Sequence, residues 1–271
     1  MTKTDGNRNY SSKSIENINH EFISINSRFD HLIMKISVFA NRIPDSRAKE
    51  YLECGVGRRT ILIRRCIENV FSIFPVERLA KLSKNENIDV DINLHAFIIN
   101  VHGIIENLGL SIAHGYRLFD KSRSENQQKH ELGLFNSRFI SRFKGRIRDY
   151  FCSDIVVSWY KQYSTNYRDS LAHRIPAYIP PAGLNDDEII IYNQCIIRIN
   201  EIYKTGWSPE VSMLLEKVDS LGVANPTYVH SEIEKAKTVA LHPQMLCDYL
   251  TVEEMINVVI DNYDLTKAST L

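Results

Sequence analysis

The sequence predicts a mostly α protein, an antiparallel helical bundle with a small β-hairpin near the C-terminus. Apolar residues recur three and four positions apart over long stretches, which is the periodicity of amphipathic helices. Two short β-leaning segments, 227–233 and 238–241, lie near the C-terminus and predict the hairpin. The content of 44% hydrophobic and 24% charged residues is that of an ordinary globular protein.

Charge and cysteine usage narrow the classes of function. Lys+Arg and Asp+Glu number 33 each, so attraction to nucleic acid must come from local patches rather than from net charge. The five cysteines are scattered and form no Cys-x-x-Cys pair, which predicts reduced thiols and neither a zinc site nor a disulfide framework. The polar N-terminus and the short apolar runs predict no signal peptide and no membrane span. We therefore expect a cytoplasmic protein with no cofactor and no metal.

The chain is expected to divide into three parts. Residues 1–12 are predicted to be disordered, residues 13–182 to form the bundle, and residues 183–271 to form a helical extension with the hairpin, packed on the same core. The first long helix is predicted from Ser14 to near Pro44. Its even apolar spacing is typical of a bundle helix or a coiled-coil seam, and a seam needs a partner, either internal or a second subunit.

The next elements follow from caps and helix breakers. Asp45 and Ser46 can cap a helical segment that Gly55 and Gly57 interrupt, after which a helix runs to Pro75. A short helix is predicted over Val76–Leu82.

The second long helix is expected to begin at a cap, Asp89 or Asp91, and it carries an unusual set of polar residues. His102 and Glu106 lie four apart and share a face, and Asn107 follows. A metal site there has little support, because the segment lacks the two-histidine pattern of a zinc helix.

After a polar loop at 120–130, a basic stripe is predicted on one helix. Its cations are interleaved with aromatic residues, and they are Arg138, Arg142, Lys144, Arg146 and Arg148. Such a stripe can bind a phosphate backbone, and it is also the ordinary solvated face of an amphipathic helix.

A further helix is predicted over 153–175 and is ended by Pro176. Asp169 and His173 lie four apart, so the carboxylate is placed to orient the imidazole. Arg168 and His173 lie five apart and thus roughly 140° apart around an ideal helix. These two groups can meet on one substrate only if the last turn distorts or if a second copy of the helix completes the site.

The C-terminal region is predicted to be helical around the hairpin. The segment Asn185-Asp186-Asp187 is expected to cap a helix that runs to Gly206, and Ser208-Pro209-Glu210 begins another through Val218. The last helix is expected to be capped by Thr251, with Glu254 three residues later.

The segment Arg168-Asp169-Ser170-Leu171-Ala172-His173 resembles the signature of the HEPN superfamily, helical-bundle domains of toxins, defence proteins and ribonucleases. In that family an arginine and a polar residue precede a histidine after a gap of four to six residues, and the gap here is four. The stretches NYRDSLAHRIPAYIPP and LHPQMLCDYLTVEE are also similar to uncharacterised bacterial proteins, a similarity that implies no function.

The resemblance implies a metal-independent endoribonuclease that dimerises so that two motifs meet. In this interpretation His173 moves a proton, Arg168 stabilises charge on the phosphate, and Asp169 orients His173. Arg174 and the basic stripe hold the RNA backbone. One polar residue of the preceding helix, among His102, Glu106 and Asn107, faces the site. The implied partners are RNA, a second copy of the chain, and an antitoxin or other protein.

A second interpretation stays open. Arg168 and His173 can be cations that bond carbonyl groups at a helix end, with Asp169 as their ion-pair partner. The protein is then a non-catalytic helical module for interaction or dimerisation.

Overall fold

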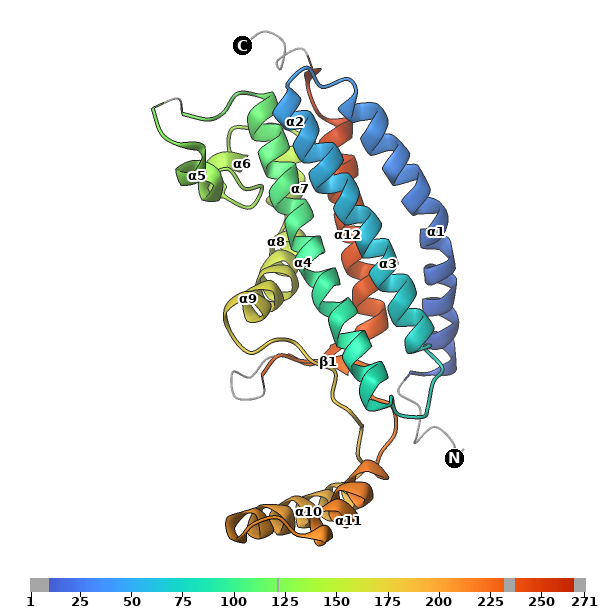
Figure 1. Cartoon of the computed structure of the whole chain (residues 1–271). Helices are drawn as coiled ribbons and strands as arrows, with labels where there is room; N and C mark the ends of the chain where they lie inside the picture. The colour runs from blue at the N-terminus through green and yellow to red at the C-terminus, as the bar shows by residue number, and fades with distance from the viewer. Residues whose placement is uncertain (1–9, 121, 232–236, 266–271) are drawn as a thin grey trace.

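The structure, a computed structural model, describes residues 10–120, 122–231 and 237–265. Long helices packed side by side make up the bundle (Figure 1). Helix α1 spans Ser12–Ala40, and α4 and α12 span Lys84–Gly115 and Leu241–Asp261. Between α1 and α4, one continuous helix is formed by α2 (Ser46–Glu50), the π-helical segment η1 (Tyr51–Gly57) and α3 (Arg58–Ile73). The predicted fold class, mostly α with a small hairpin, is confirmed.

Helix α1 buries the apolar stripe that its sequence predicted. Ile25, Phe29, Leu32 and Ile36 are each at most 3% exposed and pack into the main core. The prediction of disorder fails at its C-terminal end, because Tyr10 packs on the core and its hydroxyl donates to the Pro226 carbonyl at 3.1 Å. Residues 1–9 lie outside the described part of the chain.

Helix α12 runs parallel to α1, as two ion pairs show. Arg28 pairs with Glu253 at 2.7 Å, and Lys35, two turns later, pairs with Asp261 at 2.8 Å. The long connection between α4 and α12 therefore brings the chain back to the end of the bundle where α1 begins (Figure 1).

The predicted start of the last helix at Thr251 is wrong. Thr251 lies in the interior of α12, where its hydroxyl donates to the Cys247 carbonyl at 2.8 Å. The helix starts ten residues earlier because Pro243 falls in its first turn, where the missing N–H would have had no helical partner.

Helix α4 occupies the centre of the bundle. It is the one helix among the described residues that is long and apolar enough to cross a membrane, and 72% of its apolar window is buried inside the protein. That burial is the pattern of a core helix.

Two sequence predictions around the start of α4 are wrong. Helix α4 is capped by Ser83 in a capping box with Glu86, and neither Asp89 nor Asp91 caps it. Residues 76–82 form turns and no helix. The Arg78 side chain explains this, because it bonds the carbonyl groups of the turn, including Ala80 at 2.9 Å, and the Glu86 carboxylate at 2.8 Å.

The predicted break at Gly55 and Gly57 is also absent, because the helix passes through these residues in a π-helical turn. Gly55 is needed there for close packing, since a Cβ at this position would lie 2.7 Å from Cγ of Asn107 on α4.

Short elements cover one side of the bundle. They are α5 (Glu125–Gln128), the 3₁₀ turn η2 (Lys129–Glu131), α6 (Ser137–Ile140) and α7 (Arg146–Phe151). The loop expected at 120–130 thus contains a helical turn. A continuous helix follows: α8 (Asp154–Trp159), the π-helical segment η3 (Tyr160–Thr165) and α9 (Asn166–His173).

Helices α10 (Asp186–Thr205) and α11 (Pro209–Asp219) form a hairpin that projects from one end of the bundle (Figure 1). The predicted β-hairpin is confirmed: β1 (Thr227–Tyr228) pairs antiparallel with β2 (Val239–Ala240). The five cysteines are all free thiols.

Candidate functional site

The candidate site lies where α9 packs against the middle of α4. Tyr167 and Ser170, three residues apart, are at most 2% exposed and anchor α9 on the core. The helix ends at His173, two residues before the predicted boundary at Ile175, because Arg174 is already extended and Pro176 follows. A π-helical segment precedes each of α3 and α9, and such segments are frequent at functional sites.

The guanidinium of Arg168 is held by two side chains. Its Nη2 donates to Nε2 of His102 at 3.0 Å, and its Nη1 pairs with the Asp169 carboxylate at 2.9 Å. Its Nε is buried and has no hydrogen-bond partner among the described residues. The side chain keeps 29% of its surface exposed, so the group is fixed in orientation and still reaches solvent.

His102 is buried and its tautomer follows from its partners. Because Nε2 accepts from Arg168, the proton sits on Nδ1, which donates to the Ser164 hydroxyl at 3.0 Å. The imidazole stacks on Tyr160 at a centroid distance of 5.7 Å, and Tyr160 stacks on Phe135 at 3.8 Å. His102 is therefore a rigid, neutral acceptor for the arginine.

Glu106 lies one turn further along α4 and adds negative charge to the site. One carboxylate oxygen is 3.5 Å from Nε2 of His102. Nε2 cannot accept from Arg168 and donate to Glu106 at once, and the Arg168 contact is the shorter. The pKa of Glu106 is lowered despite its partial burial: with Nε2 of His102 committed to Arg168, the positive charges of Arg168 and Arg59 favour the carboxylate. Glu106 is therefore a carboxylate in the electrostatic field of two guanidinium groups.

Arg59 lies in the first turn of α3. It was not predicted from the sequence as a site residue. Its Nη1 donates to Oδ1 of Asn100 on α4 at 3.0 Å. Gly103 makes room for it, since a Cβ on that glycine would lie 2.4 Å from Cζ of Arg59. Two features of the sequence bear on this contact: Arg59 follows the glycine-containing segment 55–57, and Gly103 follows His102. Only the packing of α3 on α4 brings Arg59 and Gly103 together.

His173 stands apart from Arg168. Its side chain is exposed in the last turn of α9 and makes no hydrogen bond or ion pair with the described residues. The expected contact between Asp169 and His173 is not made either, because Asp169 pairs with its neighbour Arg168. Within one chain, Arg168 and His173 thus lie on different sides of the helix end, as their five-residue spacing requires.

Comparison with models of known protein families, with curated proteins and with solved structures finds no match.

The remaining predicted site residues are placed as follows. Of the three polar candidates on α4, His102 contacts Arg168 and Glu106 adjoins it, whereas Asn107 packs against Gly55 on the other side. Arg174 donates to the Asn166 carbonyl at 3.2 Å and to its side-chain oxygen at 3.0 Å. The helix-end interpretation expected Asp169 as an ion-pair partner, and Asp169 does pair with Arg168. Among the described residues, however, Arg168 bonds side chains and no carbonyl group.

The basic stripe does not lie on one helix. Its residues are divided between α6, the following loop and α7, and they are Arg138, Arg142, Lys144, Arg146 and Arg148. The break occurs at Gly145, whose φ of 62° ends any continuous helix. The five side chains are exposed. Their role in holding RNA stays a prediction.

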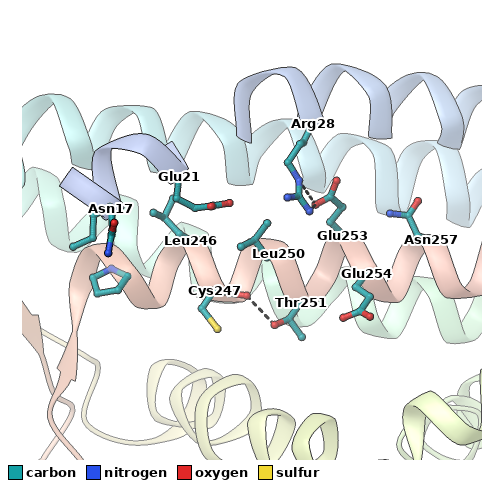
Figure 2. Close-up of a pocket in the computed structure, with 12 residues that line it drawn as sticks. Asn17, Glu21, Arg28, Leu246, Cys247, Leu250, Thr251, Glu253, Glu254 and Asn257 are labelled. Carbon is teal, nitrogen blue, oxygen red and sulfur yellow. Dashed lines mark hydrogen bonds and ion pairs between the residues drawn. The ribbon is translucent and has the colours of Figure 1, made fainter. Parts of the chain in front are cut away.

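A groove of about 810 Å³ lies between α1 and α12. Figure 2 shows Leu246 and Leu250 in it, with the carboxylates of Glu21, Glu253 and Glu254 along its length. Arg28 is the basic residue among those that line it, and it is already paired with Glu253. This groove disfavours a phosphate. No group of three or more His, Cys, Asp or Glu side chains in the described residues is arranged to hold a metal ion.

Proposed function

We propose that this protein is an HEPN-like, metal-independent endoribonuclease of a toxin or defence type that acts in the cytoplasm. One observation supports it above the others. The Arg168 guanidinium is oriented by His102 and Asp169 and is partly exposed, and the same short helix ends in an exposed His173 that has no partner among the described residues. RNA cleavage at a phosphate needs a positively charged hydrogen-bond donor in a fixed position and an imidazole that can transfer a proton.

In the proposed reaction the 2′-hydroxyl of the substrate attacks the adjacent phosphorus, which explains a preference for RNA over DNA. The O2′–P bond forms and the P–O5′ bond breaks, leaving a 2′,3′-cyclic phosphate and a 5′-hydroxyl. His173 takes the proton of the 2′-hydroxyl or gives one to the leaving oxygen. Arg168 donates hydrogen bonds to the phosphoryl oxygens as their charge grows. Asp169 and His102 position Arg168.

The proposal requires two copies of the chain. Since Arg168 and His173 are separated around the helix, Arg168 of one subunit is proposed to act with the imidazole of a second subunit. A homodimer that brings two α9 ends together supplies two such composite sites.

The test is an RNA-degradation assay on the full chain, with and without EDTA. We expect Arg168→Ala and His173→Ala each to lower cleavage at least 100-fold, the usual range for an acid–base or charge-stabilising group, with the melting temperature retained. His20→Ala, which removes another exposed histidine, is the matched control and should cleave like wild type.

Mixing the two inactive variants tests the composite site. Random exchange makes half of the dimers mixed, and each mixed dimer keeps one intact site, so about a quarter of wild-type activity should return. No recovery in demonstrably mixed dimers would place both groups in one subunit, and equal cleavage by wild type and both variants would remove the assignment.

A second candidate function is a non-catalytic interaction module, favoured by the surface of the α10–α11 hairpin. Large apolar side chains are exposed there, among them Trp207 at 71%, Met213 at 64% and Ile197 at 60%. Exposed apolar groups gathered on one element are typical of protein-binding surfaces. An antitoxin or another protein is the proposed partner, and absence of RNA cleavage together with stable complex formation would favour this function.

A further inference from the structure

The α10–α11 hairpin carries a continuous apolar surface on one of its sides. Along α10, Ile189, Tyr192, Ile196 and Tyr203 are three, four and seven positions apart, a spacing that places them on one side of the helix. Ile196 packs against the small cluster of the hairpin, and the other three are exposed. Leu215 on α11 is exposed as well.

The ion pair that joins the two helices lies on the other side of the hairpin. Nε of Arg198 is 2.8 Å from Oε1 of Glu210. Arg198 follows Ile196 by two residues and so lies about 200° from it around α10, at about 3.6 residues per turn. On α11, Glu210 directly precedes the buried Val211 and Leu215 follows it by four residues, so these two flank Val211 on opposite sides. We name the side without the ion pair the apolar face, and its exposed residues are Ile189, Tyr192, Tyr203 and Leu215.

The length and the composition of the apolar face suit one helix of a partner. Ile189 and Tyr203 are 14 positions apart, which is roughly 21 Å along α10 at about 1.5 Å per residue. A partner helix of about four turns covers this length. Tyrosine and tryptophan are the side chains that most often anchor interfaces, and Trp207 is exposed in the loop at the tip of the hairpin.

The charge of the hairpin decides the chemistry of the partner. Residues 185–221 contain seven Asp and Glu against three Lys and Arg, a formal net charge of −4, in a chain that is neutral as a whole. Asp186, Glu216 and Asp219 are exposed and make no ion pair with the described residues. A second copy of the apolar face would bring like charges together, and so would an anionic lipid surface. A basic partner instead meets opposite charge.

We propose that the apolar face binds an amphipathic helix of another protein, with leucine or isoleucine along one side and lysine or arginine beside them. The apolar side of that helix packs against Tyr192, Tyr203 and Leu215, and the three helices together bury a surface that the hairpin alone leaves in water. Its cations face the exposed carboxylates of the hairpin. This inference rests on the proposed protein-binding function, and it names the chemistry of the partner.

The experiment measures peptide binding to the full-length protein by fluorescence anisotropy. The three labelled probes are each about 18 residues long, which is enough to span the apolar face. One has leucines at helical spacing and lysines elsewhere, the second has glutamate in place of every lysine, and the third has the residues of the first in an order without a leucine stripe. We expect the lysine peptide to bind at least about tenfold more tightly than the other two, because the second meets like charge and the third has no apolar side.

Two pairs of substitutions locate the peptide on the apolar face. Tyr192→Ser with Tyr203→Ser should weaken binding of the lysine peptide about tenfold, because aromatic anchors supply much of the binding energy of an interface. Ile190→Ser is the matched control, since it removes an exposed apolar side chain from the other side of α10. Glu216→Gln with Asp219→Asn should reduce the preference for the lysine peptide over the glutamate peptide about threefold. All of these side chains are exposed, so circular dichroism should show an unchanged fold.

Three results would overturn the inference. They are equal binding of the lysine and glutamate peptides, absence of binding by the lysine peptide, and wild-type binding by the Tyr192/Tyr203 variant. The mass in solution checks the other occupant: if the same variant turns a dimer into a monomer, the apolar face joins two copies and the inference is wrong.

An RNA-cleavage assay separates this inference from the proposed nuclease. The Tyr192/Tyr203 variant should cleave RNA like wild type, because the hairpin projects from the end of the bundle and Arg168 lies at the middle of α4 (Figure 1). Peptide binding as expected in a protein that cleaves no RNA would support the inference and remove the proposed reaction. Cleavage without peptide binding would do the reverse.

Discussion

At the scale of single residues, two buried ionisable side chains outside the candidate site link the stability of the bundle to pH. Asp248 on α12 accepts from Nε1 of Trp159 at 2.7 Å and from the Gln244 amide at 2.6 Å, and its burial raises the pKa to about 7. His242 is also buried, with a ring nitrogen 2.6 Å from the Phe74 carbonyl, and its pKa is lowered to about 4. The two shifts act in opposite directions on stability.

Replacing Asp248 with Asn isolates its contribution. The folded state keeps the Asp248 proton up to about pH 7, whereas the unfolded chain loses it near its ordinary pKa of 3.8. Stability from this group is therefore fully present below about pH 4 and declines as the pH rises to about 7. Asn keeps the oxygen that accepts both hydrogen bonds and carries no charge. We expect the free energy of unfolding of Asp248→Asn, relative to wild type, to rise between pH 5 and pH 7 by at most a few kcal/mol and to level off above pH 7.

Thermal unfolding of both proteins at several pH values checks this prediction. The His242 effect is common to wild type and variant and cancels in the difference. A difference that is the same at pH 5 and pH 8 would contradict the assigned pKa of Asp248.

Residue-level prediction from the sequence succeeded where contacts are local. The four-residue spacing of His102 and Glu106 placed them on one face of α4, and both lie at the site. The contact between Asp169 and His173 was also inferred from spacing, yet Asp169 pairs with Arg168. Arg59 was not predicted as a site residue, because its position depends on the space that Gly103 leaves on another helix. Spacing fixes which side chains share a face, and tertiary packing chooses their partners.

At the scale of elements, helices were predictable from periodicity and their ends less so. A cap needs only a polar side chain at the right position, and Ser83, Asp89 and Asp91 all qualify in the sequence. Ser83 is used because Glu86 completes the capping box and also bonds Arg78. The π-helical segments η1 and η3 were not predicted, since such segments are rare in helices and depend on the packing around them.

The packing of α3 on α4 leads to a prediction for Gly103. In Gly103→Ala the new Cβ displaces the Arg59 guanidinium, whose Cζ would be 2.4 Å away, and the bond to Asn100 is lost. Alanine itself favours the helix by about 1 kcal/mol over glycine, so the fold should persist. We expect RNA cleavage to fall about tenfold because a positive charge next to Glu106 and Arg168 moves away.

Arg59→Ala provides the comparison for that experiment. If Gly103→Ala acts through Arg59, adding it to Arg59→Ala should change the cleavage rate no further. Additive losses would mean that the glycine serves the site in another way, and unchanged cleavage in all three variants would remove Arg59 from the site.

At the scale of the whole molecule, the fold class followed from composition and periodicity, but the assembly of the bundle did not. Helix α12 lies in the extension 183–271, which was expected to pack on the same core, and its buried residues belong to one core with those of α1, α3 and α4. It runs parallel to α1, which the helical pattern of the sequence alone could not show. Which helix faces pack together depends on the path of the long connection between α4 and α12. Tertiary contacts determine that path.

The α10–α11 hairpin behaves as a separate unit of this molecule, and that leads to the last prediction. Its own small cluster of Ile199, Ile202 and Val211 is distinct from the main core. At its base, Gly183 and Val223 exchange backbone hydrogen bonds of 2.9 and 3.0 Å, so the two ends of the insertion lie next to each other. A short Gly-Ser linker can therefore replace residues 185–221 without moving the bundle.

We expect the shortened protein to fold with a melting temperature within a few degrees of wild type and to cleave RNA as fast, because neither the core nor the Arg168 site loses a contact. Among the described residues, the contacts that are lost at the base of the hairpin join Lys81 to the Asp219 and Leu221 carbonyls and the Gly222 N–H to the Glu188 carboxylate, and the cost of losing them there is small. Circular dichroism and the RNA assay on the same preparation measure both quantities. An unfolded product would show that the bundle depends on the hairpin. Intact folding with lost cleavage would place the exposed apolar surface of the hairpin in the active assembly, and intact folding with intact cleavage would leave that surface free to bind another protein.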